Sequence, residues 1–351
     1  MHDTQDAAPA LPLSCRQWLQ EHAPSLDRST RHAGALLPLF ARHGLLCEDA
    51  TDAQALDAVA EVSAHSLAAG GVLAAQMSFM ALLRHAPNVA LSEHLMPALL
   101  DGSLAGSPAL TPAFAHLAHG TALQVRATET PRGWKLNGAV PWAVNLQHDG
   151  HAVALPVAFE GMKDFCVVVL GSEESGLTRT VDPSTVALRG LRAAALRLEQ
   201  VHFREDELLH VEGSQAVRQA LPLCLGLQCA MALGVARGAL AAREDSPAGA
   251  DADADAPRLH AQLAEQHAAL ADGFQDHRFA GATPALLKHR ARLLALARTA
   301  TRAERGENAF LAEGDGAAAR RVREITFLSL LRPASAASAS SSSLSTSASQ
   351  P

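Results

Sequence analysis

The spacing of apolar residues changes twice along the chain, and this change constrains the fold more than any other feature. From Leu11 to Leu100 apolar residues recur at helical intervals. From about Gly106 they alternate with polar residues, as in β-strands, and after about Gly213 the helical spacing returns. We therefore predict a multi-domain α+β protein with a helical N-terminal domain, a central β-barrel or β-sandwich domain and a C-terminal helical bundle.

These changes place the predicted domains at residues 11–104, 105–213 and 214–333. Residues 244–256 are mostly Ala, Asp, Gly and Pro without a large apolar side chain, which predicts a mobile acidic linker inside the bundle. Residues 334–351 are nearly all Ser and Ala, which predicts a disordered tail, because such a segment buries too little apolar surface to order itself.

Several local patterns give expectations about single elements. The run from Val153 to Phe159 alternates strictly and predicts a strand, and the run from Leu196 to Phe203 alternates with one slip, which predicts a β-bulge. Asn137-Gly138 is a signal for a two-residue turn. Gly234 and Gly238 lie on one predicted helix and would let a neighbouring helix approach closely.

Towards the C-terminus, Thr283-Pro284 predicts the start of a helix, because proline is favoured at the first helical position. A further short helix is predicted from Ala317 to Leu330, with Val322, Ile325 and Leu328 turned inward.

The composition argues against several classes of partner. Lys and Arg number 29 against 36 Asp and Glu, a net charge of -7, which is the reverse of a basic nucleic-acid footprint. Charges or His interrupt every apolar run, so no membrane span is predicted, and residues 1–10 lack the order of a secretory signal. The 5 cysteines are scattered and form no CxxC pair, which favours a reducing, cytoplasmic location.

Common catalytic and metal motifs are also missing from the sequence. It contains no GxxxxGK[ST], no GxGxxG after a strand, no GxSxG and no HExxH. His116 and His119 stand three apart, but no third ligand follows at a suitable spacing, so we interpret them as solvated loop residues and predict no metal site. Cys224 and Cys229 are interpreted as buried, inert thiols.

A series of short segments is spread over the region from Leu36 to Pro333. They are Leu99–Gly106 with Leu110-Thr111, Gly133–Gly138, Pro141–Asn145, Gly190–Arg192, Lys288, Gly306–Phe310 and Arg320–Glu324. In order and spacing this series resembles the acyl-CoA dehydrogenase superfamily, in which a "G…LT" turn, a "GW.LNG" hairpin and a "W.TN" turn are followed by a "G.R" strand and by a "K…GG…R..RD" ending. Glu324 takes the place of the Asp in "RD", a position that we interpret as structural.

This resemblance implies an FAD-dependent oxidoreductase that oxidises the Cα–Cβ bond of an acyl thioester such as an acyl-CoA. It implies that Leu110 and Thr111 contact the pyrimidine edge of the flavin, and that Trp142 and Val144 lie along the ring near N5. It also implies a homodimer or homotetramer that assembles through the C-terminal bundle.

The sequence departs from the family at several places. Pro112 stands where Glu usually follows the Thr, and Val144 replaces a hydroxyl residue. The segment whose Arg reaches the FAD pyrophosphate is replaced by residues 244–256. The usual catalytic Glu is absent after the last helix, where Leu330 to Ser335 contain no carboxylate, and Glu307 and Glu313 are the nearest substitutes.

Three functions are therefore carried forward. The first is an acyl-CoA dehydrogenase with a displaced base, and the second is a flavin-dependent monooxygenase of the same fold, which does not need the missing Glu. The third is a non-catalytic, degenerate paralogue that serves as a binding or assembly partner. No residue pattern in the sequence names the substrate.

Overall fold

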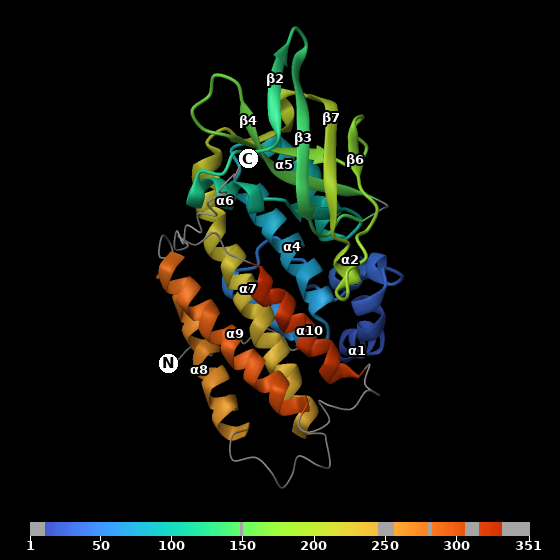
Figure 1. Ribbon diagram of the computed structural model, residues 1–351, viewed down its shortest axis with the longest axis vertical. Helices are drawn as coiled ribbons and strands as arrows, with labels where there is room; N and C mark the ends of the chain where they lie inside the picture. Colours follow the sequence, from blue (N-terminus) through green and yellow to red (C-terminus); the bar gives the residue numbers. More distant parts are fainter. Residues whose placement is uncertain (1–10, 148–149, 245–255, 280–282, 306–315, 332–351) are drawn as a thin grey trace, which may run out of the picture.

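The computed structural model describes residues 11–147, 150–244, 256–279, 283–305 and 316–331. A sheet lies at one end of the molecule and a helical bundle fills the rest (Figure 1). Helices come both before and after the strands, so the predicted order of helical, β and helical regions is confirmed. The helices before the strands are α1 (Leu13–Arg28), α2 (Leu36–Arg42), α3 (Asp52–His65), α4 (Leu67–Arg84) and α5 (Val89–Leu100), with a 3₁₀ turn at Ala33–Ala35.

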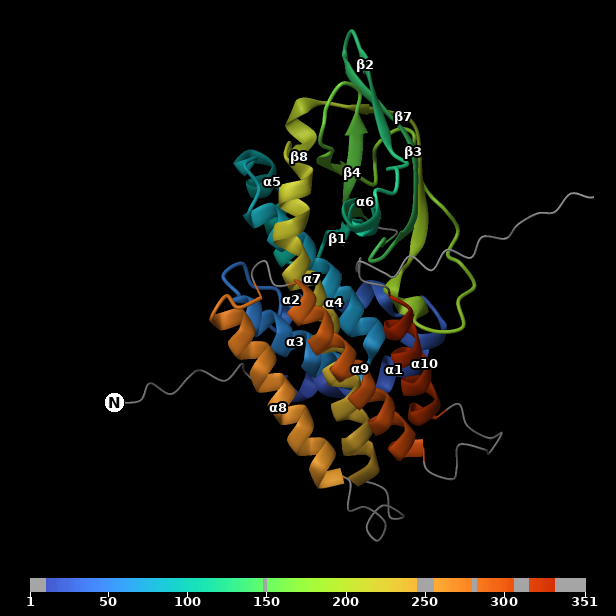
Figure 2. The same ribbon diagram turned by 60° about the vertical axis from the view of Figure 1, so that its left-hand side comes forward.

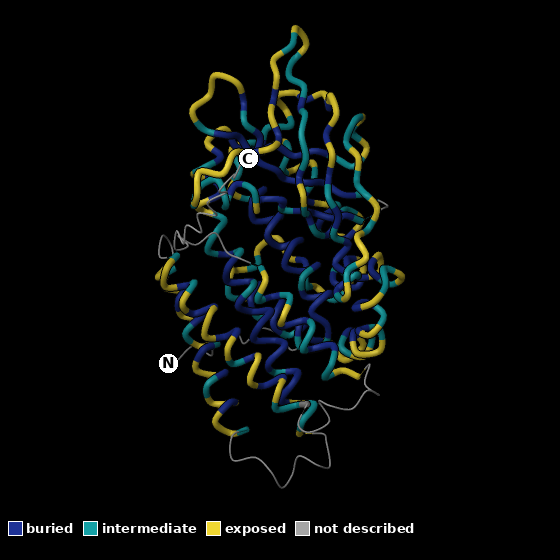
Figure 3. The backbone as a smooth tube through the Cα atoms, in the orientation of Figure 1, coloured by how far each residue is buried: buried dark blue, intermediate teal, exposed yellow. Residues whose placement is uncertain are grey.

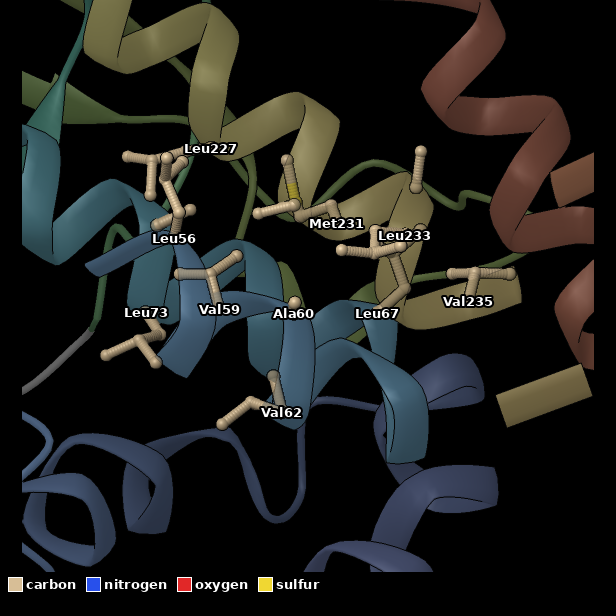
Figure 4. Close-up of a cluster of buried hydrophobic side chains, with 14 of the residues drawn as sticks. Leu56, Val59, Ala60, Val62, Leu67, Leu73, Leu227, Met231, Leu233 and Val235 are labelled. Atoms are coloured by element: carbon tan, nitrogen blue, oxygen red, sulfur yellow. The ribbon is translucent and has the colours of Figure 1, made fainter. Parts of the chain in front are cut away.

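The helices after the strands pack against the earlier ones, and the two groups share one core. Figure 2 shows α7 running from the strands down through the bundle, with α8 on the outside. Figure 4 shows side chains of α3, α4 and α7 in this core, among them Val59, Leu73 and Met231. The helices of this group are α7 (Gly213–Glu244), α8 (Ala256–Gln275), α9 (Thr283–Arg305) and α10 (Ala317–Leu330).

Two glycines allow α3 and α7 to pack closely. A Cβ atom added to Gly234 would lie 2.2 Å from the carbonyl oxygen of Ala60, and one added to Gly238 would lie 2.2 Å from that of Ala64. The predicted close approach of a helix at these glycines is confirmed. The predicted helix starting at Thr283 and the one from Ala317 to Leu330 are confirmed as well, although Val322 is only half-buried.

The strands form one mixed sheet in the order β6, β7, β3, β2, β4, β5, β8, and β1 pairs in parallel with β4. Side chains of β3 and β7 and side chains of β4 and β5 enclose a second core. The strands are β1 (Ala105–Pro108), β2 (Arg126–Thr130), β3 (Gly133–Ala143), β4 (His151–Phe159), β5 (Cys166–Gly171), β6 (Leu177–Arg179), β7 (Ala194–Phe203) and β8 (Leu208–His210), with 3₁₀ turns at Arg189–Leu191 and Glu205–Glu207.

Strand β4 is buried on both faces, which explains its sequence. The alternating residues Val153, Leu155 and Val157 point into the core of the sheet. Their neighbours Ala152 and Ala154 are small and belong to a third core, which includes residues of α4 and α5. The same strand therefore closes the sheet and joins it to the helices.

The predicted bulge is confirmed, and the predicted turn at Asn137-Gly138 is wrong. Between Leu198 and Val201, β7 has one more residue than the paired stretch of β3, and Gln200 has a left-handed backbone with φ of 56°. Asn137-Gly138 lies inside β3, opposite this bulge. Its Gly is required because φ is 139° and an added Cβ would lie 2.1 Å from the carbonyl oxygen of Gln124.

Helix α6 (Thr111–His119) interrupts the β region and was not predicted. Pro112 suits its first turn, and Gly120 ends it in a left-handed conformation with φ of 67°. His116 and His119 therefore lie on a helix and not in a loop, which corrects the sequence interpretation. The described residues contain no group of three His, Cys, Asp or Glu arranged to hold a metal ion.

Length and composition alone would allow α4 and α7 to cross a membrane, but both are core helices. Of the 18-residue apolar stretch in α4, 89% is buried inside the protein, and of the corresponding stretch in α7, 83% is buried. Figure 3 shows this burial along the centre of the bundle, with exposed backbone on the outer helices.

Candidate functional site

A buried hydrogen-bond network fixes the turn that follows β3, where Trp142 and Val144 lie. Asn145 is fully buried and has a left-handed backbone with φ of 60°. Its Nδ2 donates to Oε1 of Gln76 on α4 and to the carbonyl oxygen of Gly106 on β1, both at 3.0 Å. The amide of Gly106 donates to the same Oε1 at 2.7 Å. The side-chain amides of Asn145 and Gln76 thus connect the turn to helix α4 and to strand β1.

The other end of Gln76 completes the network. Its Nε2 donates to the carbonyl oxygens of Leu99 (3.0 Å) and Leu104 (2.9 Å), which belong to the end of α5 and the loop after it. Because buried polar groups are costly when unpaired, this arrangement holds the elements around the turn in one position.

A cavity of about 170 Å³ lies beside this turn; we call it the inner cavity. Thr111, Trp142 and Val144 all line it, so the structure brings together three of the four residues predicted to contact a flavin. The side chain of Leu110 is 1% exposed and lies in the core instead. The remaining lining comes from α4, α6, α7, α10, the strands β1 and β3 and two residues outside them: Leu67, Gly71, Ala74, Ala75, Ser78, Pro108, Phe114, Ala143, Leu191, Cys224, Leu227, Gln228, Met231, Phe327 and Leu331.

The walls of the inner cavity are mostly apolar. Among the described residues that line it, Cys224 is the one titratable group, and burial raises its pKa to about 11. Burial also raises the pKa of Cys229, to about 12. Both thiols therefore stay protonated near neutral pH, which agrees with their interpretation as inert. A carboxylate that could remove a proton from a substrate is not found in this part of the lining.

Sequence reasoning missed Gln228, which lines the inner cavity, and Arg290, which contacts Gln228 from α9. Gln228 is the lone amide within the apolar stretch from Leu221 to Val235 of α7, and this isolation was the available signal. Nε of Arg290 on α9 donates to Oε1 of Gln228 at 2.7 Å. The contact joins residues 62 positions apart.

A second, larger cavity of about 820 Å³ shares part of its wall with the inner one; we call it the outer cavity. Ser78 and Cys224 line both cavities, and their Oγ and Sγ atoms lie 4.0 Å apart. The charged lining residues of the outer cavity comprise three carboxylates and one guanidinium: Asp52, Asp164, Glu212 and Arg218. This lining is therefore net negative when its His residues are neutral.

Two His residues of the outer cavity are unusual. His277 has a left-handed backbone with φ of 54°, which is uncommon for a residue other than glycine. His210 is 7% exposed, and burial lowers its pKa. Its Nε2 lies 3.3 Å from the carbonyl oxygen of Leu82, which can only accept, so Nε2 carries the proton and Nδ1 is the acceptor.

A third cavity of about 420 Å³ lies between the loop from Asp182 to Ala193 and helix α10; we call it the side cavity. Trp142, Leu191 and Phe327 line both it and the inner cavity. Arg189 and Arg323 supply positive charge there, but Arg323 is bound to Asp27 at 2.6 Å, and Asp182 forms ion pairs with Arg179 and Arg192.

Helix α10 is held in place beside these cavities by a buried hydrogen bond from α4 and by an ion pair with α9. Glu324 is 1% exposed; its Oε1 accepts from the amide of Leu67 (3.2 Å) and lies 3.3 Å from Nε of Arg320. This burial agrees with the structural role that the sequence suggested for Glu324. Arg321 pairs with Glu304 of α9.

The inner cavity suits a flat ring better than a whole dinucleotide. Ligand pockets usually measure about 300 to 1,000 Å³. The inner cavity measures about 170 Å³ and would therefore hold only part of FAD. An isoalloxazine ring is planar, largely apolar and has carbonyl oxygens along one edge, which matches apolar walls that carry the hydroxyl of Thr111 and the amide of Gln228.

Several predicted features lie outside the described residues. These are the base candidates Glu307 and Glu313, the tail at 334–351 and most of the linker at 244–256, of which only the flanking residues Glu244 and Ala256 are described.

The sequence matches no protein-family model, and no curated protein is significantly similar to it. Solved structures are similar to it in fold. An acyl-CoA dehydrogenase from Geobacillus kaustophilus has a TM-score of 0.73 at 15% identity, with 93% of this chain and 96% of that chain covered. A glutaryl-CoA dehydrogenase from Mycobacterium smegmatis in complex with FADH2 has a TM-score of 0.70 at 17% identity, covering 91% and 88%.

A dibenzothiophene monooxygenase from Paenibacillus sp. A11-2 is also similar to the chain in fold. Its TM-score is 0.70 at 15% identity, with 92% of each chain covered. The chain therefore has the acyl-CoA dehydrogenase fold, as the sequence motifs indicated, in a divergent form. This fold is shared by enzymes that carry out different reactions.

Proposed function

We propose that the protein is an FAD-dependent oxidoreductase that binds the flavin ring in the inner cavity. The observation that carries this proposal is the meeting of Thr111, Trp142 and Val144 at one apolar cavity. Thr111 lies 31 positions before Trp142 in the sequence, and the sequence motifs indicate a common role for these residues. The FADH2 complex of a neighbour with the same fold supports the choice of cofactor.

The chain's own residues would bind and orient the ring. Trp142 offers an aromatic wall, Val144 and Leu191 keep water out, and Thr111 offers a hydroxyl at the ring edge. The Asn145–Gln76 network holds Trp142 and Val144 in position. Bound FAD would supply hydride acceptance or, when reduced, the two electrons by which one atom of O₂ enters the substrate and the other leaves as water.

The outer cavity is the place for the substrate, because it adjoins the inner cavity at Ser78 and Cys224. Coenzyme A carries several phosphate charges, and a lining of three carboxylates against one guanidinium repels such an anion. The described lining of the inner cavity also contributes no carboxylate for proton removal. Both observations favour a monooxygenase that acts on an uncharged organic molecule.

An acyl-CoA dehydrogenase is the second candidate, and it is supported by the dehydrogenases among the structural neighbours. In this case Glu307 or Glu313 would supply the base. General-base catalysis typically contributes about 10²- to 10⁴-fold in rate, so a protein without the base would react very slowly.

Two assays on the FAD-loaded protein separate the candidates. In the first, chemically reduced FAD and ¹⁸O₂ are supplied with a panel of uncharged aromatic and sulfur compounds, and we expect ¹⁸O in a product. In the second, acyl-CoAs of short, medium and long chain are added without oxygen, and we expect the flavin absorbance to stay unchanged.

Rapid bleaching by an acyl-CoA that is lost in Glu307→Gln or Glu313→Gln would overturn the monooxygenase proposal in favour of the dehydrogenase. Flavin binding without either reaction would favour the non-catalytic paralogue.

A further inference from the structure

Gln228 interrupts an apolar helix face at the wall of the inner cavity. It lies on α7 between Leu227 and Met231, which line the same cavity, and it is half-buried. We expect this amide to have hydrogen-bond partners, because burying a polar group in apolar surroundings costs free energy unless it is hydrogen-bonded.

Arg290 determines which way this amide points. An arginine can only donate, so the atom of Gln228 that lies 2.7 Å from Nε of Arg290 must be the carbonyl oxygen Oε1. The orientation of the amide is thereby fixed by chemistry. With Oε1 occupied, Gln228 has its two N–H donors left for other partners.

Arg290 is itself held firmly. It is 6% exposed, and its NH2 donates to the carbonyl oxygens of Leu328 and Leu331, both at 2.7 Å. These carbonyls belong to the last turn of α10 and the residue after it, and Leu331 lines the inner cavity. One guanidinium therefore caps α10 and sets the amide of Gln228 at the same time.

We propose that Gln228 is a specificity-determining residue that donates a hydrogen bond from Nε2 to a ring carbonyl oxygen of the ligand in the inner cavity. Arg290 is its positioning residue. This inference rests on the proposed function, since the ligand of that cavity is there taken to be the flavin ring, whose pyrimidine edge carries two carbonyl oxygens. The pairing selects an acceptor at this point of the ring and disfavours a donor.

Two substitutions at this position separate a structural role from the proposed one. Gln228→Leu removes the proposed donor, Nε2, and also the oxygen that accepts the hydrogen bond from Arg290. Gln228→Glu keeps an oxygen for Arg290 but presents a second acceptor to the ligand. We expect Gln228→Glu to fold with a melting temperature close to that of the unchanged protein. Gln262→Leu is the matched control, because Gln262 is half-buried on α8 and lines none of the three cavities described here.

The test is a titration with FAD and, separately, with lumiflavin, which carries the ring alone. Loss of one hydrogen bond should weaken binding by about tenfold in Gln228→Leu, and at least as much in Gln228→Glu. The effect should be the same for both probes, since it is located at the ring. Infrared difference spectra should show the flavin carbonyl stretch at higher frequency in both variants than in the unchanged protein.

The outcomes distinguish this inference from the function on which it rests. If the unchanged protein binds neither probe, the proposed function and the inference both fail. If it binds them, while both Gln228 variants bind equally well with an unmoved carbonyl stretch, the inference alone is overturned.

Discussion

The side-chain amide of Asn145 donates a 3.0 Å hydrogen bond to the side-chain oxygen of Gln76, and both residues are completely buried. The pair joins the turn after β3 to helix α4, and the inner cavity lies between these two elements. The pair therefore fixes the position of the turn relative to α4 on opposite walls of the proposed site.

Replacing Asn145 by Asp should damage this contact without changing its shape. The new carboxylate would face the oxygens of Gln76 and Gly106 and could donate to neither. We expect a loss of about 3 kcal/mol or more in the free energy of unfolding, measured by denaturant titration. Asn137→Asp is the control, because Oδ1 of Asn137 accepts a hydrogen bond from the amide of Gln200, and Asp keeps that acceptor. Equal stability of the two variants would contradict this account.

The close packing of α3 and α7 makes a second prediction. In Gly234→Ala the added methyl group would meet the carbonyl oxygen of Ala60, and the helices would have to separate. Overpacking of this kind typically costs about 1 to 3 kcal/mol, so the melting temperature should fall by several degrees. Gly34→Ala, where nothing lies within 4 Å of the added atom, should leave it unchanged or slightly higher. A tolerated Gly234→Ala would show that the helices are not packed this closely.

His65 should make the stability depend on pH. Burial, together with Arg16, Arg321 and Arg320, lowers the pKa of His65 from 6.5 to about 4. The unfolded chain therefore binds a proton between these values where the folded protein does not, so stability is present above about pH 6.5 and is lost as the pH falls towards 4. Solvent around the partly exposed imidazole screens its charge, so the loss is expected to be about 1 to 2 kcal/mol. Thermal melts from pH 7 to pH 4.5 should show a flatter profile for His65→Gln, and parallel profiles would refute this role.

The cysteines should differ sharply in reactivity. Cys47 is exposed, whereas Cys15, Cys166 and Cys229 are buried and Cys224 faces the inner cavity. Burial raises the pKa of Cys15 and Cys166 to about 11, so few thiolates are present at pH 8. Titration of the folded protein with a thiol reagent should show one rapidly reacting thiol, which is lost in Cys47→Ser. A fast second thiol that FAD protects would instead identify an accessible Cys224.

Patterns in the sequence were sufficient for the order of elements and for several details of the strands. The bulge in β7 was visible because its apolar residues slip by one position, and an alternating pattern follows from the geometry of a strand. The turn predicted at Asn137-Gly138 was wrong, because a dipeptide that often forms a turn also occurs in a strand that passes close to another backbone segment. The positive φ of Gly138 and the position of Gln124 explain this glycine, and the contact with Gln124 is not local.

The candidate site was predictable to a smaller extent. Motifs indicated Thr111, Trp142 and Val144, but the pairing of Gln228 with Arg290 depends on how α7 and α9 pack. Helix α6 was missed because nine residues between strand patterns were interpreted as loop. The acidic lining of the outer cavity combines Asp52 of α3, Asp164 between β4 and β5, and Glu212 between β8 and α7, and no local pattern reveals such a combination.

The most direct test of the central claim is whether the inner cavity takes the flavin ring. FAD fluorescence is followed during titration with the unchanged protein, with Val144→Trp, which would fill the cavity, and with Val181→Trp as a control at a side chain that is 90% exposed. The account predicts saturable quenching for the unchanged protein and for Val181→Trp, and its loss in Val144→Trp. Absence of saturation at high micromolar FAD, or equal binding by Val144→Trp, would contradict it.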